Sequence, residues 1–503
     1  VIFRAVMGAN GSLICCAGQK TGLDADGWVL EHAGGQPRNV MQHYVVTQEL
    51  GKGAFGSVSK VAHRKTKVER AMKAIVKKRE GSPAQSGPAI RQEVSMMKMM
   101  DHPNVVRMVE YFEDRMNVYL VMELCSGGEL FDRLLKAGSY SERVASTTMK
   151  QILSAVYFCH AQDIVHRDLK PENFMYLNDS PGSPLKLIDF GMAKRCVPGQ
   201  VLATKFGTPY YVAPQVLQAK YDRSCDVWSC GVILYILLAG YPPFNGECDG
   251  DILRRVRIGA FDVTEDEWQF ISEDAKTLVK SCLVMDPAKR ITAEKALHTP
   301  WIQKLDSSAP EKQLLNAADF QKRLRNFQKE SHLKKVAMTI VARQMDDAHM
   351  EKMKNTFMAL DKNGDGQLSL EEVQDGVKDL GLGEWEAEAL AQLLKDADVD
   401  GNGSIDYSEF LASTMHRKEM EEESRLWSAF CVFDMDGSGT ITVDELEKVL
   451  QDPSIRSMSA GADCTALLKE HDLNCDGMID FEEFLVMMRG AKLAASHIGS
   501  ASP

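Results

Sequence analysis

Three polar side chains in the first half of the chain have the types and spacing that transfer of a phosphoryl group needs. Asp168 and Asn173 lie in the stretch His-Arg-Asp-Leu-Lys-Pro-Glu-Asn, and Asp189 opens the triplet Asp-Phe-Gly. Phosphoryl transfer needs a base for the acceptor hydroxyl and Mg²⁺ to neutralise the developing charge. Asp168 can be that base, and Asn173 and Asp189 can be the metal ligands. One triplet alone can arise by coincidence, but both in this order favour the chemical role over a structural one.

Glycines upstream of these motifs can let the backbone approach a triphosphate closely. The segment consists of Leu50, Gly51, Lys52, Gly53, Ala54, Phe55, Gly56, Ser57 and Val58. Such spacing is weak alone, because it also occurs in dinucleotide-binding folds and in ordinary turns. The next predicted strand carries Ala71-Met72-Lys73, and Glu93 lies on a helical pattern that follows. Lys73 can pair with the α- and β-phosphates while Glu93 holds it, whereas a strand lysine without these neighbours is usually a surface residue.

A second set of oxygen-bearing side chains repeats four times in the second half of the chain. The pattern Asp-x-(Asp/Asn)-x-(Asp/Asn/Ser)-Gly-x-(apolar)-x-x-x-Glu begins at Asp361, Asp398, Asp434 and Asp472, at intervals of 37, 36 and 38 residues. Apolar-periodic stretches flank each copy and predict a helix, a loop and a helix. A calcium-binding EF-hand loop needs oxygen ligands at positions 1, 3, 5, 7, 9 and 12, with glycine at position 6. All four copies comply, so they are not a solvated run of charges.

The predicted calcium ligands follow from the loop positions. They are Asp361, Asn363, Asp365, Gln367, Ser369 and Glu372 in loop one, Asp398, Asp400, Asn402, Ser404, Asp406 and Glu409 in loop two, Asp434, Asp436, Ser438, Thr440, Thr442 and Glu445 in loop three, and Asp472, Asn474, Asp476, Met478, Asp480 and Glu483 in loop four. Position 7 donates a backbone carbonyl, and the apolar position 8 predicts a short β-pairing between partnered loops. Loops two and four hold four carboxylates each and the others three, so we expect loops two and four to bind calcium more tightly.

Charge divides the chain into two parts. The 503 residues carry a net charge of −12, whereas residues 346–490 alone contain 34 Asp and Glu against 12 Lys and Arg, a net of −22. The acidic part suits cations or basic partners, and nucleic acid is not an expected partner. The 12 Cys show no paired Cys-x-x-Cys spacing, and we find no secretory signal. We therefore expect reduced thiols in a cytoplasmic protein.

The elements around these motifs change character along the chain. Residues 44–50, 57–62 and 118–124 have β-type patterns, and longer helical patterns begin near residue 129. These patterns predict a strand-rich lobe followed by a helix-rich lobe. The apolar run Val227–Gly240 is about 14 residues long, short of the roughly 20 that a membrane-spanning helix needs. We expect it to be a buried helix.

A basic segment lies between the two kinds of chemistry. Residues 312–345 contain eight Lys and Arg against two acids, with apolar residues at roughly helical spacing. This pattern predicts a basic amphipathic helix over Asp319–Met345, of the kind that opened EF-hand pairs bind. Either this helix takes part in regulation or it is a spacer with solvated lysines.

From about residue 42 to residue 490, these motifs together resemble the calcium-dependent protein kinases of plants and protists. The resemblance implies a bilobal α+β protein kinase fold followed by an all-α, calmodulin-like domain of two EF-hand pairs. It implies an amino-terminal extension at 1–41, a kinase domain at 42–302, an autoinhibitory junction helix at 303–345, the EF-hand domain at 346–490 and a tail at 491–503.

The activity implied by the resemblance is calcium-dependent transfer of the ATP γ-phosphate to Ser or Thr hydroxyls of protein substrates. The implied cofactors are Mg²⁺ with ATP and up to four Ca²⁺. The junction would hold the kinase inactive until the EF-hands bind calcium. It would do so either as a pseudosubstrate or by withholding a brace from the kinase.

Further site residues are implied by the resemblance alone. Lys170 would contact the γ-phosphate, and it is similar to the serine/threonine subfamily rather than the tyrosine one. The nucleotide site would also include Ala71, Met122 as gatekeeper, Glu123 and Cys125 at the hinge, Glu129 and Met175. Glu129 and Glu172 would receive an arginine upstream of the target hydroxyl and so favour basic substrates. The alternative for these two glutamates is a solvated face and a salt bridge within the lobe.

Two positions in the kinase region differ from, or vary within, the family pattern. Ala213-Pro214-Gln215 stands where the family has Ala-Pro-Glu, so Gln215 would give Arg290 a neutral hydrogen bond in place of a charge-assisted one. This change removes no catalytic group. Thr204 stands where many kinases are phosphorylated, with Arg167 available as a phosphate partner. Because family members often carry an acid there, Thr204 is either a switch or an ordinary loop residue.

The sequence near the amino terminus matches a lipidation pattern. Gly8 follows Met7 in a myristoylation motif, and Cys15 and Cys16 can be palmitoylated as the second signal. Residues 1–6 precede this methionine. Either they lie upstream of the true start, or Gly8 is internal and is not acylated. Acylation would anchor the protein to the cytoplasmic face of a membrane.

Two other functions would use parts of these motifs. A calcium-responsive scaffold would bind nucleotide without turnover, but the presence of Lys73, Asp168, Asn173 and Asp189 argues against it. A calcium buffer needs neither a basic helix nor phosphoryl-transfer motifs.

Overall fold

The computed structural model describes residues 30–31, 40–53, 56–77, 87–137, 141–180, 182–204, 207–264, 266–306, 317–345, 350–379, 392–415, 422–450 and 464–489. They form two compact units. The first, which we call the helical unit, comprises Gly127–Tyr176 and Pro184–Ala309. The second comprises Ala25–Ser126, Leu177–Ser183 and Pro310–Pro503. The predicted lipidation residues Gly8, Cys15 and Cys16 lie outside the described residues.

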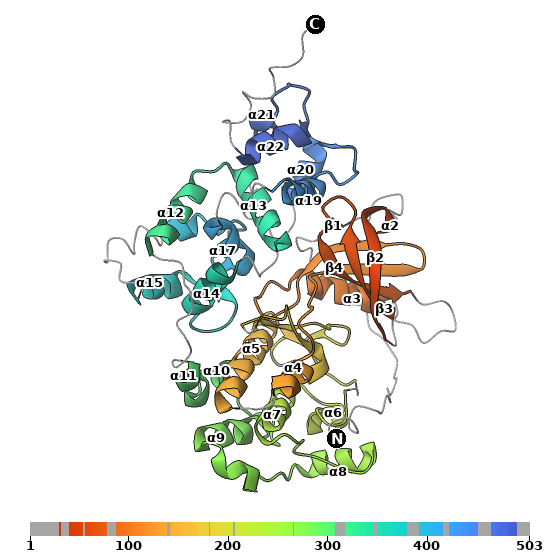
Figure 1. Cartoon of the computed structure of the whole chain (residues 1–503), viewed down its shortest axis with the longest axis vertical. Coiled ribbons are helices and arrows are strands. Elements are labelled where there is room, and N and C mark those ends of the chain that lie inside the picture. Colours follow the sequence, from red (N-terminus) through yellow and green to blue (C-terminus); the bar gives the residue numbers. More distant parts are fainter. Residues whose placement is uncertain are drawn as a thin grey trace. The chain divides into compact units, whose positions relative to one another are not determined.

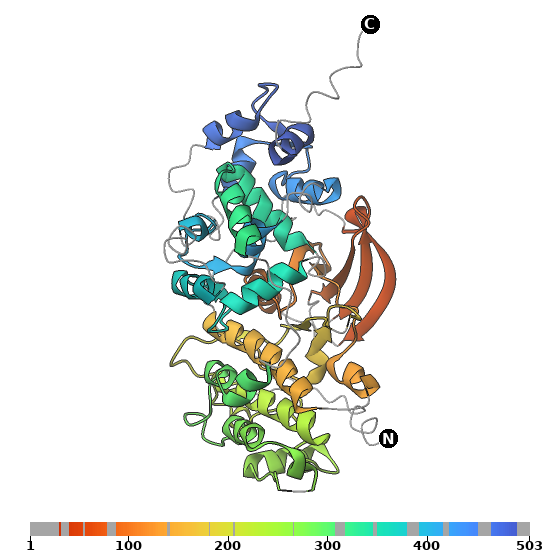
Figure 2. The same ribbon diagram turned by 60° about the vertical axis from the view of Figure 1, so that its left-hand side comes forward.

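A six-stranded sheet in the second unit forms the strand-rich lobe (Figure 1). Its strands are β1 (Leu30–Glu31), β2 (Tyr44–Gly53), β3 (Gly56–His63), β4 (Glu69–Val76), β5 (Met108–Glu113) and β6 (Asn117–Met122), in the order β1-β5-β6-β4-β3-β2. β1 pairs in parallel with β5, and the other pairs are antiparallel. Figure 2 shows the sheet nearly edge on, with the usual strong twist. The helices α2 (Val40–His43) and α3 (Gly87–Lys98) complete this lobe.

The strand expected over residues 118–124 ends earlier, at Met122. Glu123 N–H still donates to the Arg107 carbonyl at 3.0 Å, but Arg107 N donates to the Glu123 side chain at 2.8 Å. The ladder ends here because the Glu123 side chain takes the N–H that a continuing strand would pair with a backbone carbonyl.

The helical unit is built around one buried helix. Its helices are α4 (Leu130–Ala137), α5 (Glu142–Ala161), α6 (Pro214–Leu217), α7 (Ser224–Ala239), α8 (Asp249–Ile258), α9 (Glu273–Cys282), α10 (Ala293–Leu297) and α11 (Pro300–Asp306). The expectation of a buried helix over the run 227–240 is confirmed by α7, in which residues 225–237 are all buried. The helix ends at Gly240, whose φ of 81° suits glycine. Among the described helices, none is long and apolar enough to span a membrane.

Four helix-loop-helix units follow in the second unit, and we call residues 350–489 the sensor. Its described helices are α14 (Glu351–Leu360), α15 (Leu370–Asp379), α17 (Tyr407–Thr414), α19 (Glu423–Phe433), α20 (Val443–Leu450), α21 (Cys464–His471) and α22 (Phe481–Arg489). The loops pair through the short strands β11 (Gln367–Leu368) with β12 (Ile405–Asp406) and β13 (Thr440–Ile441) with β14 (Ile479–Asp480). Leu368 lies opposite Ile405, and Ile441 opposite Ile479, so the predicted pairing at position 8 is confirmed.

The single helix expected over Asp319–Met345 is wrong, because the segment forms two helices. These are α12 (Ala317–Gln328) and α13 (His332–Gln344). The break falls at Ser331, whose side chain accepts from Lys334 N and so caps the start of α13. The apolar periodicity runs through both helices and therefore concealed the break.

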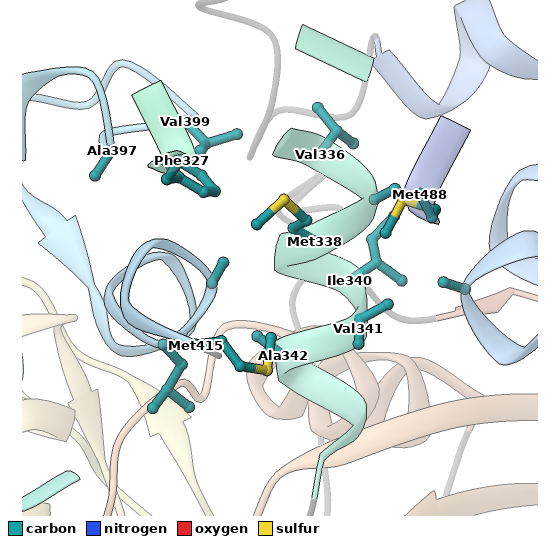
Figure 3. Packing of buried hydrophobic residues seen from close by; sticks show 14 of the residues in the cluster. Phe327, Val336, Met338, Ile340, Val341, Ala342, Ala397, Val399, Met415 and Met488 are labelled. Atoms are coloured by element: carbon teal, nitrogen blue, oxygen red, sulfur yellow. The ribbon is translucent and has the colours of Figure 1, made fainter. Parts of the chain in front are cut away.

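The apolar side of α13 is buried in the same core as both EF-hand pairs. Its neighbours include α17 from the first pair and α19 from the second. Figure 3 shows Met338 on the side of Phe327 and Val399, and Ile340 on the side of Met488. The helix is thus buried in a core that is formed partly by methionines, which adapt to such a contact.

Candidate active site and calcium sites

A lysine and a glutamate form a close ion pair in the strand-rich lobe. Lys73 lies on β4 and Glu93 on α3, and Lys73 Nζ is 2.7 Å from Glu93 Oε1. Glu93 is only 3% exposed, so the ion pair with Lys73 is buried on its side. The pair fixes the direction of the lysine ammonium, as a phosphate-binding lysine requires.

The glycine-rich segment is the β2–β3 hairpin. A Cβ atom on Gly56 would lie 1.8 Å from the Ala74 carbonyl oxygen, whereas nothing lies within 4 Å of one on Gly51. Gly56 is therefore required by the close approach of β4, and Gly51 faces open space. The predicted residues Ala54 and Phe55 lie outside the described residues.

The other predicted nucleotide-site residues of this unit lie on the strands next to the hairpin. Leu50 and Lys52 are on β2, Ser57 and Val58 on β3, Ala71 on β4, Met122 at the end of β6, and Glu123 and Cys125 in the segment after it. Met122 pairs directly with Ala71 across the sheet. Ala71 is two residues before Lys73 on β4. The register thus places the predicted gatekeeper, Met122 on the neighbouring strand β6, two positions along from Lys73.

Asp168 is the centre of a polar network in the helical unit. Its Oδ2 is 3.0 Å from Lys170 Nζ, and Asn173 Nδ2 donates to its backbone carbonyl at 2.7 Å. Thr208 Oγ1 donates to Asp168 Oδ1 at 3.4 Å. Burial opposes the charge on Lys170, but the nearby Asp168 carboxylate raises its pKa overall, so the ammonium stays charged. A carboxylate that can act as a base, Asp168, thus lies next to a cation, Lys170.

Asp226, a buried residue of α7, holds the backbone of this loop. Its Oδ2 accepts from His166 N at 2.9 Å and its Oδ1 from Arg167 N at 2.8 Å. His160 Nε2 lies 2.9 Å from Asp226 Oδ2. Burial raises the pKa of Asp226, but these hydrogen bonds, led by that of His160, lower it overall. Arg167 adopts a φ of 72°, a strained conformation that these bonds hold in place.

Sequence reasoning missed Asp226. The signal available was an acid in the first turn of an apolar helix, directly after Cys225 and before Val227. Such a charge is costly unless it is paired.

Asp189 lies beside a fully buried aromatic anchor. Its Oδ1 accepts from Gly191 N at 3.1 Å. The next residue, Phe190, is buried and meets the His166 ring edge to face, with centroids 5.1 Å apart. The anchor fixes the backbone at Asp189, while the carboxylate itself is only partly buried.

Glu129 and Glu172 form an acidic cluster in the same unit, together with Asp132. Burial, then Asp132 and Glu172, raise the pKa of Glu129. Glu172 Oε2 is buried, with no hydrogen-bond partner in the part of the chain that the structure describes. Glu129 also forms an isolated β-bridge with Met175. Such a cluster favours an incoming cation.

Gln215 and Arg290 meet as predicted. Arg290 Nη2 donates to Gln215 Oε1 at 3.2 Å, and Gln215 Nε2 donates to Ser224 Oγ at 3.2 Å. Arg290 is 5% exposed, and this burial lowers its pKa to about 10. The Gln215 amide therefore accepts the hydrogen bond that a carboxylate would accept in the family pattern, but it brings no negative charge to Arg290.

Thr204 lies close to Tyr221, to which its side chain hydrogen-bonds. Arg167 Nη1 donates to the Tyr221 hydroxyl at 3.3 Å. Thr204 and the guanidinium of Arg167 thus share one neighbour.

All four calcium loops close in the same way. The glycine at position 6 has a φ of 81°, 90°, 94° or 83° in loops one to four. The glutamate at position 12 accepts from the backbone N–H at position 3 in every loop: Glu372 from Asn363, Glu409 from Asp400, Glu445 from Asp436 and Glu483 from Asn474, at 3.0–3.1 Å. The loops therefore have the turn and the closing ligand that an EF-hand requires.

The charges within the loops fit a bound cation. Asp398, Asp400 and Glu409 offer oxygens within 4.8 Å of one another, as do the equivalent residues Asp434, Asp436 and Glu445. Burial and then Asp365 raise the pKa of Asp361 to about 7, and burial raises that of Asp400 to about 6. Asp434 Oδ1 and Asp472 Oδ1 are buried without a hydrogen-bond partner among the described residues. A hard divalent cation with oxygen ligands would relieve this crowding.

Comparison with known families matches both halves of the chain. Residues 44–302 match the protein kinase domain, and residues 350–415 and 423–489 match the EF-hand domain pair. The chain is 43% identical over 445 residues to calcium-dependent protein kinase 5 of Plasmodium falciparum (isolate 3D7), covering 88% of this chain and 77% of that protein. It is 40% identical over 459 residues to calcium-dependent protein kinase 34 of Arabidopsis thaliana, covering 90% and 86%. The chain belongs to the calcium-dependent protein kinases.

As a calcium-dependent protein kinase, it is an enzyme that phosphorylates serine and threonine residues and is activated by calcium. It uses Mg²⁺ with ATP and binds Ca²⁺ through its EF-hands. The predicted fold class, a bilobal kinase followed by paired EF-hands, is confirmed.

Proposed function

We propose that Asp168 is the base that accepts the proton of the substrate hydroxyl, and that Lys170 stabilises the transferring phosphate. The 3.0 Å contact between these two side chains carries the proposal. Asn173 and Asp189 would hold Mg²⁺, which, when bound, neutralises charge on the phosphates. Lys73, fixed by Glu93, would orient the α- and β-phosphates.

The acidic cluster supports a preference for basic substrates. Glu172 Oε2 lacks a hydrogen-bond partner among the described residues, and burial together with the nearby acids raises the pKa of Glu129. An arginine upstream of the target hydroxyl would satisfy both groups. The test is the KM for an Arg-x-x-Ser peptide against a Gly-x-x-Ser peptide. Glu172→Gln should reduce the preference, and an unchanged ratio would contradict it.

Calcium regulation would act through α13. Two guanidinium groups of the strand-rich lobe bind its carboxyl-terminal end: Arg107 Nη2 donates to Met345 O at 2.9 Å, and Arg70 Nη2 donates to Gln344 O at 2.6 Å. Cations at this end satisfy free carbonyls and favour the helix dipole. The buried face of α13 packs on the sensor. These contacts support a brace: the sensor would grip α13 and so order the strand-rich lobe at high calcium, and that support would be withheld at low calcium.

Two modifications complete the proposal. Phosphorylation of Thr204 would create an anion near Arg167 and order this segment further. Myristoylation of Gly8 with palmitoylation of Cys15 or Cys16 would hold a chain that starts at Met7 on a membrane surface. Incorporation of labelled myristate into that chain, and its absence in Gly8→Ala, tests the second proposal.

The catalytic assignment is tested with Asp168→Asn. We expect kcat to fall by about 10²–10⁴, the contribution of a general base. Calcium binding by the same variant should be unchanged, because the sensor is intact. Full activity in Asp168→Asn would contradict the assignment, and wild type that binds ATP and calcium without turnover would favour the scaffold.

A further inference from the structure

We propose that the second calcium loop docks directly on the strand-rich lobe through Asp101, and that calcium site two is the site coupled to the kinase through this contact. Asp101 follows α3 and is 5% exposed. Its partner, Ser408, occupies position 11 of loop two, between the predicted ligands Asp406 and Glu409. Both residues belong to the same compact unit. The proposal rests on the calcium regulation proposed above and adds which site carries it.

Both oxygens of the Asp101 carboxylate accept hydrogen bonds from Ser408. Ser408 N donates to Oδ2 and Ser408 Oγ donates to Oδ1, each at 2.9 Å. Ser408 is fully buried. Hydrogen bonds to a buried carboxylate are strong, and the loss of either partner leaves a polar group unsatisfied.

Arg343 of α13 links the same contact to the junction. Its Nη2 lies 3.6 Å from Asp101 Oδ2 and 3.8 Å from Asp406 Oδ2. Its Nε donates to Ser408 Oγ at 3.3 Å, so the hydroxyl accepts from Arg343 while it donates to Asp101. The guanidinium thus lies between a carboxylate of the kinase and a carboxylate of the calcium loop. The strand-rich lobe, the junction and the sensor meet at this point.

Only loop two has a residue that can make this contact. Position 11 is an acid in each of the other loops: Glu371 in loop one, Asp444 in loop three and Glu482 in loop four. These three side chains are exposed, whereas Ser408 is buried. A carboxylate at this position would repel Asp101 and would have no hydrogen to donate to it. The serine therefore distinguishes loop two as the docking loop.

The contact is coupled to the calcium ligands because Ser408 lies inside the loop's closing turn. Asp406 accepts from Glu409 N at 2.9 Å, and Glu409 Oε2 accepts from Asp406 N at 3.0 Å. This reciprocal cap spans Ser408. Calcium and Asp101 both bind this turn. A change in the conformation of the turn on calcium binding therefore changes how well Asp101 binds Ser408. By linkage, docking must change the calcium affinity of site two by the factor by which calcium changes docking.

The test is a double-mutant cycle in the full chain with Asp101→Ala, Ser408→Ala and the double variant. Calcium binding is measured by competition with a chelating indicator, and the half-activating calcium concentration is measured in parallel. We expect each single variant to change both the calcium concentration at half-saturation and the half-activating calcium concentration by about three- to tenfold. The double variant should change them no more than the larger single effect, because one contact is lost.

A matched control is Glu371→Ser, which places serine at position 11 of loop one, where no partner is expected; it should shift the half-activating concentration by less than about twofold. If Asp101→Ala does not fold, Ser408→Glu decides, since it gives loop two the acid of the other loops. Unchanged calcium binding in the serine variants, or independent effects in the cycle, would overturn the docking contact. Wild type without calcium-dependent activity, but with calcium binding that shifts in Asp101→Ala, would instead overturn the proposed regulation and keep the contact.

Discussion

At the residue scale, Arg290 shows how one substitution leaves a buried charge with a weaker partner. Its guanidinium meets the Gln215 amide and backbone carbonyls, and its pKa falls to about 10 because it is desolvated. A carboxylate at position 215 would offset that desolvation.

We predict that Gln215→Glu stabilises the kinase. A carboxylate acceptor in place of the neutral amide turns the bond from the Arg290 guanidinium into an ion pair, which should add about 1 kcal/mol to the free energy of unfolding. This should raise the midpoint of thermal unfolding by about 2–4 °C. Scanning calorimetry with Gln215→Ala as the control checks the prediction. A midpoint at or below that of wild type would show that Arg290 gains nothing from the charge.

Glu110, a buried glutamate of β5, should make the stability of the strand-rich lobe depend on pH. Burial raises the pKa of Glu110 to about 7, although Tyr44 and Arg70 partly oppose it. The native state therefore holds this proton more tightly than the unfolded chain. The stability that depends on the proton is complete below the ordinary carboxyl pKa and is lost as the pH rises through about 7.

Glu110→Gln removes this titration and still accepts a hydrogen bond. We expect its unfolding midpoint, relative to wild type, to be higher at pH 8 than at pH 5.5, measured at saturating calcium. A difference between the two proteins that does not depend on pH would contradict the assignment.

At the element scale, the junction depends on where α13 begins. Ser331 caps its first turn and also lies 3.1 Å from His471 Nε2 of α21. The cap therefore fixes where α13 begins, and with it which side of the helix packs into the sensor.

We predict that Ser331→Ala destabilises the junction by about 1 kcal/mol, the usual effect of losing a helix cap. The half-activating calcium concentration should rise by about fivefold, since 1.4 kcal/mol corresponds to tenfold. Ser331→Asp restores a cap and is the matched control. Equal behaviour of both variants would show that the cap does not matter to regulation.

Elements governed by local rules could be predicted from the sequence. The glycine turn at position 6 and the pairing of Leu368 with Ile405 follow from loop positions alone. The break at Ser331 was missed because apolar spacing continues across it. Asp226 and Asp101 were missed because their partners are 59 or more residues away in the chain. No local pattern marks such contacts.

At the scale of the whole molecule, the chain combines a kinase and its calcium sensor, joined by α12 and α13. The acidic sensor binds the cation, and the apolar side of the basic junction is buried in the sensor's core. Arg70, Arg107 and Asp101 extend that contact to the strand-rich lobe. Calcium removal should therefore weaken the support of the lobe that carries Lys73 and Glu93.

The most direct measurement is phosphate transfer from Mg-ATP to an Arg-x-x-Ser peptide, with saturating calcium and with excess chelator, using the chain from Met7. We predict strong transfer with calcium and at least a tenfold loss with chelator, reversed when calcium is restored. Equal transfer in both conditions would keep the kinase and contradict regulation by the sensor.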